Sequence, residues 1–160
     1  MDILFTPWRY EYVSTVDKRV GCIFCEKPSE SDDRANLVLH RGERAFIMLN
    51  LYPYSTGHVM VAPYQHVETI EKLDSRTVLE MMEQASLAMK AIRETFSPEG
   101  FNLGINIARV AGAGITDHVH LHVVPRWAGD SNFMSVISHT RVLPMSLDEV
   151  WLALKDRIED

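Results

Sequence analysis

Short apolar runs, separated by polar and turn-forming residues, occupy the segment from residue 36 to residue 62. The runs are 37–39, 45–49 and 59–61. Runs of this length, with Pro53 and Gly57 between the last two, predict antiparallel strands rather than strand–helix–strand units. Residues 101–108 and 118–124 predict two further strands, and the second of these alternates between polar and apolar side chains up to residue 123.

Two segments have the apolar spacing of an amphipathic helix. The first begins at a cap, Asp74 or Ser75, and runs to about Phe96, where the Ser97–Gly100 segment stops it. Its expected buried face consists of Val78, Met81, Met82, Ala85, Met89 and Ile92. The second helix starts at the capping box 146–149. Its expected stripe is Leu147, Trp151, Leu154 and Ile158. Strands and helices together predict an α+β domain, with a mainly antiparallel sheet, one long helix and a C-terminal helix.

Two segments near the start show no periodicity. Residues 1–20 contain several aromatic side chains, and we expect an N-terminal arm that packs on the core of the same chain or on a second subunit. Residues 26–34 are polar, and we expect a surface loop. With 160 residues, 46% of them hydrophobic, the chain is long enough for a single domain over residues 1–160 and too apolar for intrinsic disorder.

The net charge of -6 argues against a protein that binds a nucleic-acid polymer through its backbone, because such binding needs a surplus of Lys and Arg. A local basic pocket for a small phosphate compound stays open. No apolar run reaches the length of a membrane span, and the first residues lack the positive region of a signal peptide. We therefore expect no membrane partner and a cytoplasmic location, where thiols stay reduced.

Three histidines alternate with apolar residues at 118–124, which makes this the most informative stretch. On a strand, His118, His120 and His122 share one face at intervals of about 7 Å. Such a row is a poor core, because every imidazole brings two nitrogens that need partners. Two functional interpretations compete: a metal site, or a neutral histidine that acts as a nucleophile toward phosphorus. The small residues Ala111 to Gly114 just before the row favour the second, since their backbone N–H groups can approach an anion closely.

Cys22 and Cys25 form a Cys-x-x-Cys pair, which has three interpretations. It is a thioredoxin-like redox pair, two buried thiols, or half of a zinc site. The redox interpretation lacks its strand–helix–strand context, and the zinc interpretation needs two more ligands. Seven histidines supply candidates.

The pattern His-φ-His-φ-His-φ-φ at 118–124 is the defining motif of the histidine triad (HIT) superfamily, which this chain resembles. Segments 49–54, 57–61 and 124–133 are most similar to the branch that contains fragile-histidine-triad hydrolases and bacterial diadenosine tetraphosphate phosphorylases. The resemblance runs from about residue 8 to residue 145. It implies a single HIT domain with a HIT-like α+β fold, and a homodimer whose sheets join across the two-fold axis.

The resemblance assigns roles to several polar residues. His120 falls at the position of the nucleophile that attacks an α-phosphate and forms a nucleotidyl-histidine, which a second nucleophile resolves. His122 and His58 match histidines that line the phosphate site and support that nucleophile. Asn50 matches a ligand of the ribose hydroxyls, and Asn106 falls where related hydrolases carry a phosphate-contacting glutamine.

The loop before the triad departs from the family pattern. Related hydrolases carry Gly-Gln-Thr there and the phosphorylases tend to carry a serine, whereas this chain has Gly112, Ala113 and Gly114, followed by Ile115 and Thr116. We expect backbone amides of this loop and Thr116 to contact the substrate instead. This departure leaves open whether water or inorganic phosphate resolves the intermediate.

Zinc-containing members of the superfamily use a Cys-x-x-Cys pair, a histidine after a Pro-x-x motif and the first triad histidine. Cys22, Cys25, His66 and His118 reproduce that set, which implies a closed, structural zinc site. His40 and His139 match no family position, and we expect both at the surface.

The expected function is nucleotidyl transfer from a dinucleoside polyphosphate, such as diadenosine tetraphosphate, through His120 to water or phosphate. Two alternatives stay open. One is a nucleoside phosphoramidase or another nucleotidylyltransferase that uses the same triad. The other is a nucleotide-binding signalling module with little turnover.

Overall fold

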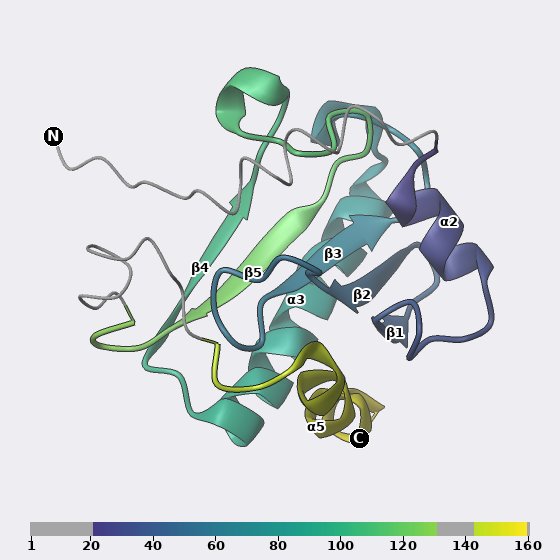
Figure 1. Ribbon diagram of the computed structural model, residues 1–160. Coiled ribbons are helices and arrows are strands. Elements are labelled where there is room, and N and C mark those ends of the chain that lie inside the picture. Colours follow the sequence, from purple (N-terminus) through teal and green to yellow (C-terminus); the bar gives the residue numbers. More distant parts are fainter. Residues whose placement is uncertain (1–20, 131–142, 160) are drawn as a thin grey trace, which may run out of the picture.

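Five strands form one antiparallel sheet in the order β1-β2-β3-β5-β4 (Figure 1). The strands are β1 Val38–Arg41, β2 Ala45–Leu49, β3 Val59–Pro63, β4 Gly100–Ile105 and β5 Leu121–Arg126. This computed structural model describes residues 21–130 and 143–159, so the expected N-terminal arm and His139 lie outside the described residues. The prediction of an α+β fold around an antiparallel sheet is confirmed.

Alternate residues of the central strands enter two different apolar clusters. Ile47 of β2, Val61 of β3 and Val123 of β5 belong to the larger cluster, which the long helices cover. Phe46, Met48, Met60 and Ala62 point to the opposite face and pack with Phe24. Because both faces are covered, every residue of β2 and β3 is buried. The triad strand β5 lies between the central strand β3 and the edge strand β4.

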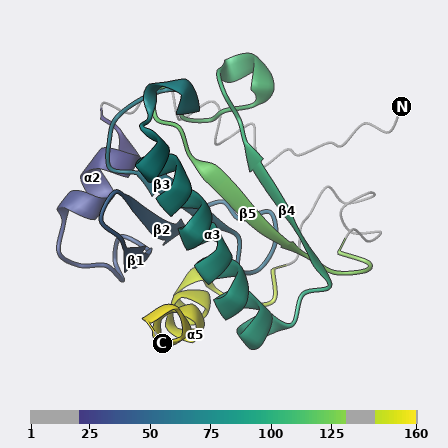
Figure 2. The same cartoon turned by 180° about the vertical axis from the view of Figure 1, so that it is seen from behind.

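Two long helices cover the face with the larger cluster, as Figure 2 shows. Helix α3 spans Ser75–Phe96, and its cap Asp74 accepts hydrogen bonds from the backbone N–H groups of Arg76 and Thr77. Helix α5 spans Leu147–Glu159. Its predicted capping box is present, because the Glu149 carboxylate accepts from the Ser146 backbone N–H at 2.8 Å and the Glu149 N–H donates to Ser146 Oγ at 3.3 Å. Both helices match their predicted positions.

A third helix, α2 Ile23–Ser29, lies on the other face, where a surface loop was expected from residue 26 onward. The expectation of a loop is therefore wrong for residues 26–29. The helix starts with hydrogen bonds from the backbone N–H groups of Cys25 and Glu26 to the Cys22 carbonyl. Its one buried side chain, Phe24, is 1% exposed. A single apolar anchor gives no periodic signal, which explains the error.

Several boundaries and exposures also differ from the predictions. The strand expected at 101–108 ends at Ile105, and the one expected at 118–124 begins at Leu121. Met82 faces solvent with 50% exposure, because the buried side of α3 centres on its alanines. His40 is partly buried rather than on the surface. None of the helices in the described part of the chain has the length and apolar character that a bilayer crossing needs.

Candidate active site and metal centre

The three triad histidines lie on the α2 side of the sheet but serve two different clusters. Only His122 is inside β5, opposite Met60 of β3 and Gly104 of β4. His118 and His120 precede the strand. The rings of His120 and His122 lie 4.8 Å apart between centroids, whereas His118 turns toward the two cysteines.

His120 is held as a neutral imidazole with one nitrogen directed to solvent or ligand. Its Nδ1 lies 2.9 Å from the His118 carbonyl oxygen, and because a carbonyl only accepts, Nδ1 carries the proton. The lone pair is then on Nε2, so this nitrogen can act as the nucleophile. Burial lowers the pKa of His120, which is 4% exposed, and only that hydrogen bond opposes the shift. The Phe24 ring packs on this imidazole at 4.6 Å between centroids.

A chain of hydrogen bonds sets the tautomer of His122. The backbone N–H of Tyr54 donates to His58 Nδ1 at 3.0 Å, so His58 carries its proton on Nε2. That Nε2 lies 3.0 Å from His122 Nδ1 and donates to it. His122 therefore carries its own proton on Nε2, which makes that atom a donor beside His120. His58 itself is 1% exposed and supports the site from behind.

Two thiols and two imidazoles converge at the start of α2. Cys22, Cys25, His66 and His118 offer ligand atoms that all lie within 4.8 Å of one another. Cys22 Sγ is 3.3 Å from His118 Nδ1, and Cys25 Sγ is 3.3 Å from His66 Nδ1. A tetrahedral ion with zinc-like bond lengths to sulfur and nitrogen needs about 3.6 Å between such atoms. The four residues therefore fit a metal ion after small shifts.

The surroundings of these ligands suit metal binding. His118 Nε2 donates to the Pro63 carbonyl at 2.8 Å, which leaves the Nδ1 lone pair facing the sulfurs. His66 Nε2 faces the Asp117 carboxylate at 3.7 Å. Burial raises the pKa of the Cys22 thiol to about 11, so this thiol becomes charged only against a cation.

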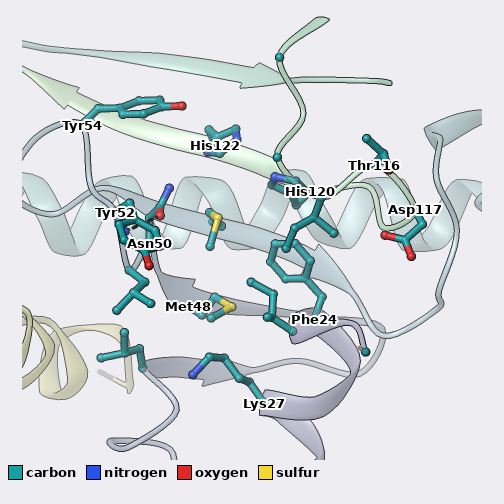
Figure 3. Close-up of a pocket in the computed structure, with 18 of the residues that line it drawn as sticks. Phe24, Lys27, Met48, Asn50, Tyr52, Tyr54, Thr116, Asp117, His120 and His122 are labelled. Atoms are coloured by element: carbon teal, nitrogen blue, oxygen red, sulfur yellow. Dashed lines mark hydrogen bonds between the residues drawn. The ribbon is translucent and has the colours of Figure 1, made fainter. Parts of the chain in front are cut away.

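A cavity of about 370 Å³ lies between α2, the ends of the central strands and the loop before the triad (Figure 3). One part is apolar and is lined by Ile23, Phe24, Leu37, Met48 and Met60. The other part is polar and contains His120, His122 and the loop before the triad. In Figure 3 the His120 ring lies between Asn50 and Thr116. An apolar slot that opens onto imidazoles suits a nucleoside with its phosphate.

The structure brings most of the predicted site residues to this cavity. Asn50, Thr116, Gly112 and Gly114 line it together with the two histidines. Asn50 is held by the Tyr52 backbone N–H, which donates to its side-chain oxygen at 2.9 Å. Ala113 is buried and Asn106 follows β4, and neither lines the cavity.

The loop before the triad is a tight turn rather than an open row of amides. Residues Arg109–Ala111 form a 3₁₀ turn that ends at Gly112 in the left-handed region. The N–H groups of Ala111 and Ala113 donate to the Ala108 carbonyl, and that of Gly112 donates to the Arg109 carbonyl. In this structure the turn itself uses these three amides, which the sequence suggested as donors to a phosphate.

Sequence reasoning missed several residues at the site. Phe24 stands between the two cysteines in a segment without periodicity, and the role of the Tyr54 amide depends on backbone geometry that no motif encodes. Lys27 and Arg109 also line the cavity. The sequence shows only that Lys27 lies close to the Cys-x-x-Cys pair and that Arg109 lies close to the small-residue loop.

Comparison with known proteins places this arrangement among related chains. The family model described as HIT domain matches residues 32–129. A protein of Mycobacterium tuberculosis named AP-4-A phosphorylase is 38% identical over 152 residues, which covers 90% of this chain and 77% of that protein.

Two solved structures share the fold. A Zn-bound histidine triad family protein from Mycobacterium smegmatis matches with a TM-score of 0.63 and 22% identity, over 93% of this chain and 92% of the other. A hypothetical histidine triad nucleotide-binding protein from Sulfolobus tokodaii matches with a TM-score of 0.64 and 22% identity, over 93% of this chain and 91% of the other. With the triad, the matched family model and a relative at 38% identity, this chain belongs to the HIT domain family.

Proposed function

We propose that this chain is a nucleotide hydrolase or phosphorylase that cleaves dinucleoside polyphosphates by nucleotidyl transfer through His120. The observation that carries the proposal is the state of that imidazole: neutral, with Nδ1 on a carbonyl and Nε2 toward a cavity that has an apolar slot. Neutral imidazole is a competent nucleophile toward phosphorus.

The reaction has two displacements at one phosphorus. His120 Nε2 forms a bond to the α-phosphorus, and the bond from that phosphorus to the bridging oxygen breaks, so the rest of the molecule leaves as a nucleoside polyphosphate. Water or an oxygen of inorganic phosphate then attacks the same phosphorus and releases His120. With diadenosine tetraphosphate the first step yields ATP, and the second yields AMP with water or ADP with phosphate.

The other polar groups have roles that follow from their protons. His122 Nε2–H donates to an oxygen of the attacked phosphate, where negative charge builds up in the transition state. Thr116 and the Gly114 amide contact the same phosphate, and Asn50 binds the ribose hydroxyls. His58 positions His122. Asn106 and Ala113 have no direct contact with the substrate in this proposal.

Phosphate is the acceptor that we favour. The supporting finding is the relative at 38% identity, which is named AP-4-A phosphorylase.

We infer that the cluster of Cys22, Cys25, His66 and His118 binds zinc. Two thiols and two imidazoles are a ligand set that zinc favours, and all four tetrahedral positions would be filled by protein. Such an ion is structural: it ties the start of α2, and with it Phe24, to the segment that carries His120. Elemental analysis that finds no zinc while both thiols titrate would contradict this inference.

A homodimer joined through β4 is also proposed. β4 is one of the two edge strands of the sheet, and its Leu103 is 40% exposed. Sedimentation that shows a single chain per particle would contradict it.

Product analysis tests the function directly. The purified chain is incubated with diadenosine tetraphosphate, with and without inorganic phosphate, beside His120→Ala. Phosphorolysis predicts ADP and ATP with phosphate, and hydrolysis predicts AMP and ATP without it. Binding without turnover would instead support a nucleotide-binding module, and turnover by His120→Ala would refute the mechanism.

A further inference from the structure

Most of the backbone amides in the turn before the triad are already bonded within that turn. Its three central amides, those of Ala111, Gly112 and Ala113, are bonded to carbonyls of the same turn. Ala108 enters the turn at φ 65° and ψ 164°, a conformation that is almost restricted to glycine. A strained turn whose three central amides are already bonded points to a further purpose, which is to position a side chain.

Arg109 is the side chain that this turn carries to the cavity. Among the described residues, the charged side chains that line the cavity besides the histidines are Lys27, Arg109 and Asp117. The cavity wall thus has two cations and one anion, although the whole chain has a net charge of -6. Lys27 lies on α2 at the apolar end, and Arg109 lies at the end formed by the loop.

Burial indicates which phosphate Arg109 meets. His120 is 4% exposed and lies at the floor of the cavity, whereas Arg109 is exposed and therefore lies at its rim. In a displacement at phosphorus the leaving oxygen lies opposite the attacking atom. A group that leaves from His120 at the floor must therefore move out toward the rim.

We propose that Arg109 binds the phosphates beyond the one that His120 attacks, and so selects substrates with a long polyphosphate chain. The proposal rests on the proposed function and adds a specificity determinant to it. Arginine suits this task because its planar guanidinium can hold two phosphate oxygens at once. It also offsets the charge that grows on the leaving polyphosphate.

Equilibrium binding tests the proposal without any turnover. Calorimetry compares AMP, which has only the attacked phosphate, with ATP, which adds two more, for the wild type, Arg109→Gln and Arg109→Lys. Arg109→Gln should weaken ATP binding about 10- to 100-fold, the effect of losing a hydrogen bond to a charged group, and change AMP binding less than about 3-fold. Arg109→Lys should restore part of the loss, since lysine keeps the charge but not the fork.

Two further variants separate a local contact from a general effect of charge. Arg157→Gln removes an exposed arginine on α5, away from the cavity, and should leave both affinities unchanged. Lys27→Gln removes a cation at the apolar end and should weaken AMP and ATP binding by the same factor. If Arg109→Gln also weakens both equally, or changes neither, the proposal is wrong.

Kinetics then distinguish this proposal from the proposed function. For Arg109→Gln, kcat/KM should fall about 10- to 100-fold on diadenosine tetraphosphate and less than about 3-fold on adenosine phosphoramidate, whose leaving group has no phosphate. If the wild type cleaves neither compound but binds ATP through Arg109, the proposed function is refuted, while the proposal that Arg109 selects long polyphosphate chains stands. If Arg109→Gln lowers kcat/KM equally on both compounds, the proposed role of Arg109 is refuted, while the proposed function stands.

Discussion

Replacing His58 by asparagine should impair the reaction although His58 does not line the main cavity. In the wild type His58 accepts a hydrogen bond at Nδ1 from the Tyr54 backbone N–H and donates one from Nε2 to His122 Nδ1, both at 3.0 Å. Asparagine has an oxygen near the Nδ1 position, so it can still accept from the Tyr54 amide, but it has no donor near Nε2. His122 then loses the contact that keeps its proton on Nε2.

The size of the effect follows from the hydrogen bond that is lost in the transition state. A hydrogen bond to a charged group contributes about 1.5–3 kcal/mol, which corresponds to about 10- to 150-fold in kcat/KM. His58→Gln is the matched control, because its amide can place a donor near the Nε2 position. It should retain most of the activity, with a loss below about 5-fold, while it leaves the Tyr54 N–H unpaired and lowers stability by about 1–3 kcal/mol.

Two assays check this reasoning. Steady-state cleavage of diadenosine tetraphosphate gives kcat/KM for both variants, and ¹⁵N spectra of the imidazoles report which nitrogen of His122 carries the proton. We expect the proton on Nε2 in the wild type and in His58→Gln, and a shift toward Nδ1 in His58→Asn. Equal activity losses in the two variants, or an unchanged His122 tautomer in His58→Asn, would refute the hydrogen-bonded chain.

Two further predictions concern the metal and the strained turn. Removal of the metal with a chelator should lower Tm and weaken AMP binding, because α2 loses its anchor and Phe24 loses its contact with the His120 ring. Cys25→Ser should have the same two effects. An unchanged Tm would contradict a structural role of the metal. Ala108→Gly should stabilise the fold by about 1 kcal/mol in denaturant unfolding, since relief of about 1–3 kcal/mol of strain exceeds the roughly 0.4–1 kcal/mol that glycine's extra unfolded-state entropy costs. A lower stability of Ala108→Gly would show that the conformation is not strained.

The parts of the fold that the sequence predicted are those where local pattern and tertiary packing agree. The cap at Asp74, the capping box at Ser146 and the pairing of the consecutive strands β1, β2 and β3 depend on residues close in the sequence. Helix α2 was missed because one residue, Phe24, anchors it, and its packing against the histidine rings is a tertiary contact. Met82 was misplaced because the alanines of α3 let the sheet approach its other side.

The site shows the same division. Residue identity and spacing suggested a metal site or a nucleophile in the histidine row, and the resemblance to the HIT superfamily then singled out His120 and the four possible metal ligands. The protonation of His122 depends on the Tyr54 amide, and that of His118 on the Pro63 carbonyl. The use of the loop amides within their own turn depends on the φ angle of Ala108. None of these backbone groups has a side-chain signature that a sequence pattern can reveal.

The most direct test of the account is to trap the covalent intermediate. The protein is mixed with diadenosine tetraphosphate in the absence of inorganic phosphate, quenched with denaturant at alkaline pH to preserve the acid-labile phosphorus–nitrogen bond, and measured by intact mass and peptide mass spectrometry. We predict an increase by one adenylyl group on the peptide that contains His120, absent from His120→Ala and discharged when phosphate is added before the quench. Turnover without any adduct in the wild type, or an adduct on a different residue, would contradict it.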